Sequence, residues 1–77
     1  MSAAGPTRFY LMHCVEGDEC LVADFDTIED ARERLHRESV LDPRAELSIW
    51  DSRGGLLWLW DRRRRVLQDA SPKRRRA

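Results

Sequence analysis

The chain has too few cysteines to be held together by disulfide bonds. Cys14 and Cys20 are the only two, and their spacing matches neither a CxxC redox motif nor half of a zinc-binding knuckle. We expect both to be small buried thiols in a reducing compartment. Residues 1–7 lack the apolar core of a signal peptide, and no apolar run approaches the roughly 20 residues of a membrane span. The sequence therefore predicts a cytoplasmic protein with no membrane association.

Residue patterns that carry chemistry are equally scarce. Nothing supports a Ser/His/Asp arrangement, a phosphate-binding glycine loop or a pair of carboxylates placed for acid–base work. The pair Gly54-Gly55 is typical of a turn, and the two histidines, His13 and His36, lack a partner motif. We predict no catalytic, cofactor-binding or metal-binding residues. The protein is expected to be neither an enzyme nor the receptor of a small-molecule substrate.

Charge is present in quantity and is unevenly distributed. The net charge is zero, but residues 1–61 carry 13 acidic and 6 basic side chains, and residues 62–77 carry 1 acidic and 8 basic side chains. The two parts thus have net charges of −7 and +7, an arrangement that steers partners more than it shapes a fold. Arginine outnumbers lysine 13 to 1, a bias typical of GC-rich bacterial or phage genomes.

Apolar periodicity predicts an α+β domain of type ββαββ. We expect a flexible N-terminus over 1–7, the domain over 8–61, and a tail over 62–77 that is largely flexible or a short helix capped by Asp61. A helix begins after Thr27, whose hydroxyl suits an N-cap, and fades near Ser39, after which Val40 and Leu41 turn back onto the domain. Four strands form one antiparallel sheet with the helix on one face, at positions 8–15, 20–25, 46–50 and 56–60.

Turn chemistry sets the expected register of the two hairpins. A loop at Gly17-Asp18 places Val15 opposite Cys20 and puts the two cysteines on opposite faces. This register excludes a disulfide and disfavours a metal site formed by His13, Cys14 and Cys20. A turn over residues 51–55, with Gly54 left-handed, places Ile49 opposite Leu57. This register assigns the following residues to the helix side: Tyr10, Met12, Cys14, Leu21, Ala23, Phe25, Leu47, Ile49, Leu57 and Leu59.

One helix covers only one face of a sheet, and the other face is expected to hold apolar residues too. An apolar patch of this size usually marks an interaction surface. We predict a homodimer that packs two sheets face to face, or a partner protein on the same surface. The predicted interface residues are Leu11, Val22, Trp50, Leu56, Trp58 and Trp60. Aromatic residues beside arginines also stack on bases, but the surrounding aliphatic residues favour a protein interface.

Two basic clusters mark the C-terminal end. They neutralise phosphates if a nucleic acid binds, or contact an acidic assembly, or remain a solvated tail against the protein's own acidic body. The candidate nucleic-acid-binding residues are Arg62, Arg63, Arg64, Arg65, Lys73, Arg74, Arg75 and Arg76.

The acidic body supports an alternative function. Seven carboxylates within residues 16–30 suit a protein-directed inhibitor or adaptor, as small phage proteins provide, in which the basic tail plays no part. The acidic residues at positions 16, 18 and 19 would then carry the binding.

Overall fold

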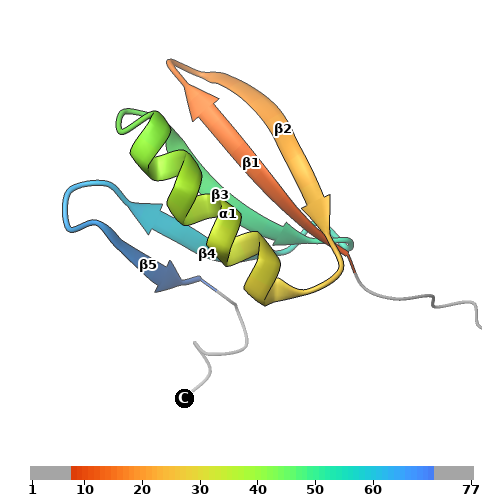
Figure 1. Ribbon diagram of the computed structural model, residues 1–77. Coiled ribbons are helices and arrows are strands. Elements are labelled where there is room, and N and C mark those ends of the chain that lie inside the picture. The colour runs from red at the N-terminus through yellow and green to blue at the C-terminus, as the bar shows by residue number, and fades with distance from the viewer. Residues whose placement is uncertain (1–7, 71–77) are drawn as a thin grey trace, which may run out of the picture.

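Five strands and one helix make up residues 8–70, the part of the chain that the computed structural model describes (Figure 1). The order along the chain is ββαβββ. The elements are β1 (Phe9–Val15), β2 (Asp18–Phe25), α1 (Ile28–Leu41), β3 (Glu46–Asp51), β4 (Leu56–Asp61) and β5 (Val66–Asp69).

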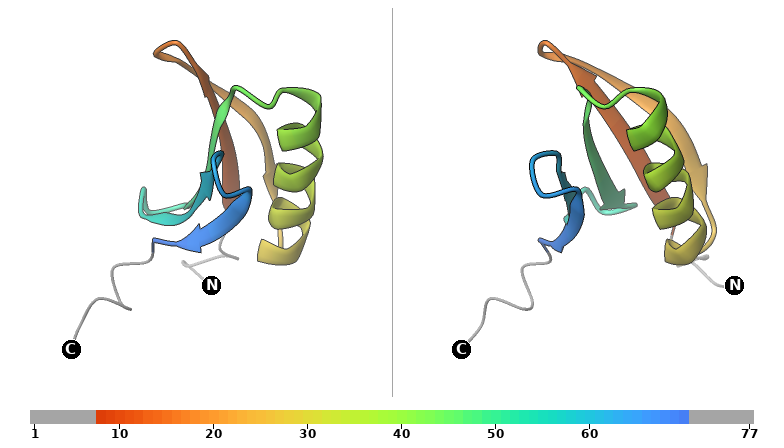
Figure 2. Two further views of the ribbon diagram at one scale, coloured as in Figure 1. Left: turned by 90° about the vertical axis from the view of Figure 1, so that its left-hand side faces the viewer. Right: turned by 60° about the vertical axis from the view of Figure 1, so that its left-hand side comes forward.

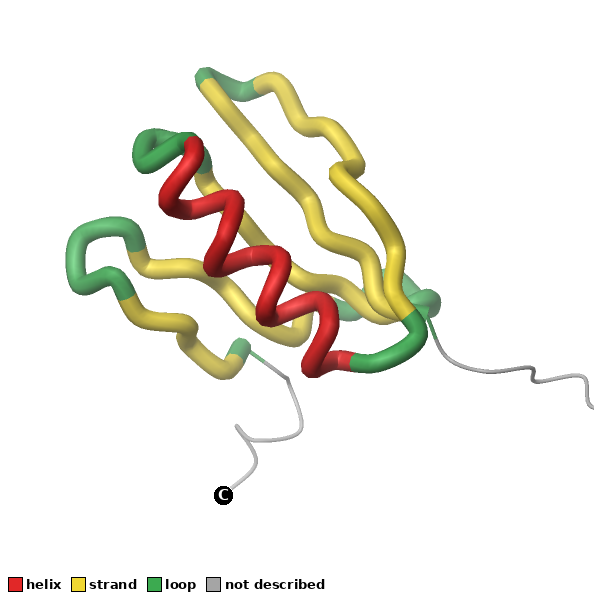
Figure 3. Tube along the Cα trace, viewed as in Figure 1, coloured by secondary structure: helices red, strands yellow, loops and turns green. Residues whose placement is uncertain are grey.

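The strands form one antiparallel sheet in the order β2-β1-β3-β4-β5, so that β3 is the central strand. Helix α1 packs across one face of this sheet, mainly on β1, β2 and β3 (Figures 2 and 3). The α+β class and the single helix on one face are confirmed. The predicted strand count was one too low, because β5 pairs with β4 within the segment that was assigned to a tail or a short helix.

The β1–β2 hairpin uses a loop one residue earlier than predicted. Glu16 and Gly17 both have positive φ, 54° and 88°, as a two-residue turn of type I′ requires. Val15 therefore lies opposite Asp18 instead of Cys20. A bulge at Leu11 and Met12 then shifts the register by one residue, so that Leu11 lies opposite Ala23 and Phe9 lies opposite Phe25.

The two cysteines lie on opposite faces of this hairpin, as predicted. Cys14 pairs with Glu19 and Cys20 with His13, and both thiols are free. Cys20 is exposed, however, so the prediction that both thiols are buried was wrong for it. His13 lies on the helix side of β1, where its Nε2 is 3.3 Å from Asp42 Oδ2 at the end of α1.

Helix α1 begins where the sequence predicted and ends later. The hydroxyl of Thr27 accepts a hydrogen bond from the backbone N–H of Asp30 at 3.2 Å, which confirms the N-cap. The helix continues to Leu41, and the backbone N–H of Asp42 donates to Glu38 O at 2.9 Å. Val40 and Leu41 are 67% and 70% exposed, so they do not turn back onto the core.

The β3–β4 hairpin contains the predicted turn but a different register. Gly54 is left-handed, with φ of 87°, as expected. Ile49 nevertheless lies opposite Trp58 and not Leu57, because a bulge between Ile49 and Trp50 shifts the pairing of the two strands by one residue. A slip of one residue moves every side chain of a strand to the other face. Strand β4 consequently turns Trp58 and Trp60 toward the helix.

The core lies between α1 and the sheet and inverts much of the predicted face assignment. Leu11, on the central part of β1, is fully buried, and Trp60 is 7% exposed. The predicted face of β1 was wrong because β1 is apolar on both faces, so alternation alone does not identify the side that meets a helix. The buried core consists of Leu11, Ala31, Leu35, Ala45, Leu47, Ile49 and Trp60, with Phe9, Val15, Val22, Phe25, Ile28, Trp58 and Leu67 packed against it.

Candidate functional site: the open face of the sheet

The face of the sheet opposite α1, here called the open face, carries an apolar surface. Cross-strand register arranges it in rows. One row runs from Tyr10 to Trp50, and the next runs from Leu21 through Met12 and Ser48 to Leu59. Side chains opposite one another in adjacent strands share a face and lie in contact distance. The apolar members of the open face are Tyr10, Met12, Leu21, Trp50, Leu56 and Leu59.

No element of residues 8–70 packs on the open face, because the helix of that region lies wholly on the other side (Figure 2). Leu21 is 55% exposed and Leu59 is 41% exposed. Tyr10, Met12 and Trp50 are half-buried. A five-stranded sheet with one solvated side normally carries polar residues there. This face carries the composition of an interface instead.

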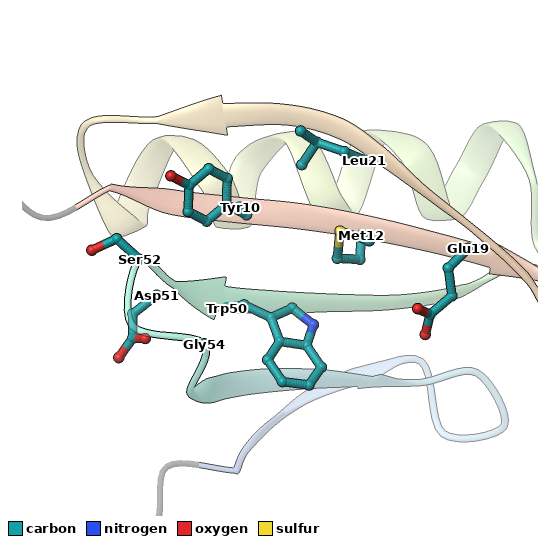
Figure 4. Close-up of a pocket in the computed structure, with 8 residues that line it drawn as sticks. All are labelled: Tyr10, Met12, Glu19, Leu21, Trp50, Asp51, Ser52 and Gly54. Atoms are coloured by element: carbon teal, nitrogen blue, oxygen red, sulfur yellow. The ribbon is translucent and has the colours of Figure 1, made fainter.

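The Trp50 side chain is hydrogen-bonded to Ser48, its neighbour on the same face of β3. The indole N–H donates to Ser48 Oγ at 2.9 Å, which satisfies the polar group of the ring on the protein itself. Beside it lies a hollow of about 450 Å³ between Tyr10, Met12 and Leu21, with Glu19 and Asp51 at its margin. Figure 4 shows these side chains in front of the strands, with the helix behind. The ring thus presents an apolar surface ready for contact.

A charged clamp closes one end of the open face. Arg8 donates to Asp24 Oδ2 through Nη2 at 2.8 Å and Nε at 3.2 Å, and it also pairs with Asp26. The hydrogen bond that Arg8 donates to Asp24 raises the pKa of Arg8. The charges of Asp24 and Asp26 add smaller increases, and desolvation acts in the opposite direction. The clamp keeps these charges paired beside Tyr10, and joins the start of β1 to the end of β2.

A second surface lies in the loop between β4 and β5, residues Arg62–Arg65, here called the arginine loop. Asp61 Oδ1 accepts from the backbone N–H groups of Arg63 and Arg64 at 3.0 and 3.2 Å, and Asp61 O accepts from that of Arg65 at 2.7 Å. Asp61 therefore caps a hairpin turn and not the short helix that the sequence suggested. The first four predicted nucleic-acid-binding arginines form a structured loop.

The arginines of this loop differ in their partners. Arg62 donates to Arg44 O at 2.6 Å and lies 3.7 Å from Glu46, so it joins the loop to the start of β3. Arg64 Nε is 3.9 Å from Asp61 Oδ2 and remains 77% exposed. Within the described residues, Arg63 and Arg65 form no ion pair. The loop therefore presents cationic groups to solvent.

An acidic counterpart occupies the other edge of the sheet at the same end. The β1–β2 turn and the start of β2 carry three exposed carboxylates, here called the acidic tip: Glu16, Asp18 and Glu19. Cys14 pairs with Glu19 on one side and with Glu46 on the other, and Glu46 meets Arg62. The acidic tip and the arginine loop thus lie at one end of the sheet, on opposite edges.

The structure separates the six predicted interface residues. Trp50 lies on the open face, and Leu56 lies opposite it in the register. Leu11 and Trp60 are buried beneath α1, and Val22 and Trp58 pack against the same core, so their predicted placement on the open face was wrong. Lys73, Arg74, Arg75 and Arg76 lie outside the described residues.

Sequence reasoning missed the open-face residues Tyr10, Met12, Leu21 and Leu59. A usable signal was present in the charged residues of β1 and β2. Arg8 lies two residues before Tyr10, and Asp24 is the cross-strand partner of Tyr10. Both charged side chains therefore share the face of Tyr10 and Met12 and mark it as the side reached by solvent.

No protein-family model, curated protein or solved structure matches this chain. Within residues 8–70, no group of three or more His, Cys, Asp or Glu side chains is placed to hold a metal ion. In the same region, no helix is both long enough and apolar enough to cross a membrane.

Proposed function

We propose that this protein is a small non-enzymatic interaction domain that self-associates by packing its open face against that of a second copy. The observation that carries the proposal is the uncovered row of Tyr10 and Trp50 beside Met12, Leu21 and Leu59. Burial of a large apolar side chain contributes about 1.5–3 kcal/mol. Two such sheets pack about 10 Å apart with their side chains interdigitated.

A second copy suits this surface better than an unrelated partner for an electrostatic reason. The chain has zero net charge, so two copies do not repel one another as two strongly charged bodies would. Each copy nevertheless carries an acidic tip at one edge and an arginine loop at the other. A single-core domain of 77 residues also gains stability when a second subunit covers its exposed apolar side.

The test is the mass of the protein in solution, measured by light scattering during size-exclusion chromatography over a range of concentrations. The wild-type chain is expected at twice its monomer mass of 9.1 kDa. Met12→Glu is expected to shift it to the monomer, because a charge would be buried in the middle of the interface. Val40→Glu is the matched control, since Val40 is 67% exposed at the end of α1, away from the open face.

Two outcomes contradict the proposal. One is a wild-type chain that remains monomeric at high micromolar concentration. The other is a dimer that withstands Met12→Glu as well as Val40→Glu, since the interface would then lie elsewhere. Circular dichroism of both variants establishes that they are folded.

A second candidate function is binding of a nucleic acid or an acidic assembly through the basic residues. The supporting observation is that Arg62–Arg65 form a structured loop with exposed guanidinium groups. Each phosphate contact would release counterions, so affinity should fall steeply with salt. Fluorescence anisotropy with labelled single- and double-stranded DNA tests this. Loss of binding in Arg63→Glu/Arg65→Glu would support it, and unchanged binding would contradict it.

The adaptor alternative differs in the residues it needs. If the acidic body captures a partner protein, charge reversal at Glu16, Asp18 and Glu19 should abolish capture, while changes in the arginine loop should not. The cytoplasm remains the expected location for all of these functions.

A further inference from the structure

The positions of the two charged edges assign an orientation to the self-association proposed above, on which this inference rests. We infer that two copies stack with a two-fold axis parallel to the strands and above β3, so that each acidic tip faces the arginine loop of the second copy. The inference follows from the strand order and from the location of the charges.

The strand order leaves two simple ways of superposing two open faces symmetrically. With the axis parallel to the strands, β2 of one copy lies over β5 of the other, and β1 lies over β4. With the axis across the strands, β2 lies over β2. The second arrangement would bring Glu19 of one copy, which lies on the open face, toward Asp24 of the other, and it would separate each acidic tip from the arginine loop of the second copy.

The first arrangement also preserves the level of each residue along the strands. Trp50 then meets Trp50 of the second copy across the axis, because β3 is the central strand. Met12 and Leu59 belong to one row and lie one strand to either side of β3, so Met12 faces Leu59 of the second copy. The exposed Leu59 side chain would enter the hollow beside Met12 and Leu21.

The charged ends complete the match. The acidic tip and the arginine loop lie at one end of the sheet, and the axis keeps that end common to both copies. The carboxylates of Glu16 and Glu19 then face the exposed guanidinium groups of Arg63, Arg64 and Arg65, once on each side of the axis. Asp18 pairs with Val15 and therefore lies on the helix side. Stacked sheets lie about 10 Å apart. The arginine side chains of the loop are long enough to cross this gap and form ion pairs with carboxylates of the second copy.

A complementary pair of charge-reversal variants tests this orientation. Glu16→Arg/Glu19→Arg alone and Arg63→Glu/Arg65→Glu alone place like charges together at both contacts, so each is expected to weaken self-association at least tenfold. An equimolar mixture of the two variants places opposite charges together at both contacts. The mixture is therefore expected to recover the wild-type dissociation constant, measured by analytical ultracentrifugation.

The location of these residues keeps the test informative. All four are exposed, so the variants should fold, and circular dichroism confirms that they do. If the wild-type chain dimerises but the mixture fails to recover affinity, the orientation is wrong and the open-face interface still stands. A wild-type chain that never dimerises contradicts the interface itself. Arginine variants that lose DNA binding with no change in dimerisation overturn the orientation and favour a nucleic acid as the partner of the loop.

Cross-linking gives an independent measurement of the same orientation. In a background with Cys14→Ser and Cys20→Ser, chains with Met12→Cys and chains with Leu59→Cys, the latter carrying a tag that alters their mass, are mixed with a short bismaleimide. The expected product is the mixed dimer, because these two positions face each other across the gap of about 10 Å between sheets. Efficient linking of Met12→Cys chains to themselves would overturn the orientation, because it requires the axis across the strands.

Discussion

The guanidinium group of Arg32 lies over the ring of Trp58, 4.8 Å from the ring centroid. Arg32 belongs to α1, so this contact places Trp58 on the helix side of the sheet. One turn further along the helix, His36 contacts Trp60 edge-on, with the ring centroids 5.3 Å apart. Helix α1 therefore covers two of the three tryptophans and leaves Trp50 to the open face.

Removal of the Arg32 charge should weaken this packing slightly. We expect Arg32→Gln to lower the free energy of unfolding by about 0.5–1 kcal/mol, the usual range for a cation over an aromatic ring at an exposed site. Urea denaturation measures the change. Glu33→Gln, at the exposed neighbouring position, is the control and should have a smaller effect. Equal effects of the two substitutions would argue against the contact.

Substitution of Trp60 and substitution of Trp50 should have different effects, because Trp60 lies in the core and Trp50 lies on the open face. Trp60→Ala empties a core position, so it is expected to cost about 3–5 kcal/mol, enough to unfold much of so small a domain. Trp50→Ala should leave the monomer folded and abolish self-association. Circular dichroism and light scattering on both variants measure this division. A folded, monomeric Trp60→Ala beside an unfolded Trp50→Ala would reverse the face assignment.

The N-cap of α1 gives a local stability prediction. Thr27→Ala removes the acceptor of the Asp30 N–H bond and is expected to lower the free energy of unfolding by about 1 kcal/mol. Thr27→Ser keeps an acceptor oxygen and should remain close to wild type. The midpoint of thermal unfolding distinguishes them, and identical losses in both variants would show that the hydroxyl is not the source of stability.

The backbone of the arginine loop stores strain at one residue. Arg65 has φ of 59°, a left-handed conformation that costs a non-glycine residue roughly 1–2 kcal/mol. Arg65→Gly should therefore raise the free energy of unfolding, by up to about 1 kcal/mol after the entropic cost of glycine. Arg63→Gly removes the same charge without this relief, so it should be neutral or destabilising in urea denaturation. A gain of equal size in both would point to charge repulsion within the loop as the cause.

Much of the fold was predictable because its signals are local. Thr27 identifies the helix start, Gly54 identifies a left-handed turn position, and the alternation of β3 identifies Leu47 and Ile49 as core. The apolar residues of β1 and β4 did not identify the faces of these strands, since both strands are apolar on two sides and the orientation of β4 depends on a bulge. A bulge depends on how two strands meet, which neither strand's sequence specifies alone.

The fifth strand was missed for a different reason. Residues 61–66 repeat the layout of residues 51–56, an aspartate followed by four loop residues and an aliphatic residue. Asp51 accepts from the backbone N–H groups of Arg53 and Gly55, as Asp61 does from those of Arg63 and Arg64. Four consecutive arginines resemble a solvated tail in composition, and this resemblance concealed the turn. The aspartate spacing is the signal that would have identified the hairpin.

The two outermost strands limit how the sheet grows. Strand β2 carries Asp18, Glu19 and Asp24 along its length, and β5 is only four residues long. Addition of another copy edge to edge would bring carboxylates together or offer a short template for backbone pairing. The proposed packing of two open faces, by comparison, would occupy that surface once and close the assembly. Self-association of this kind would give discrete pairs and not filaments.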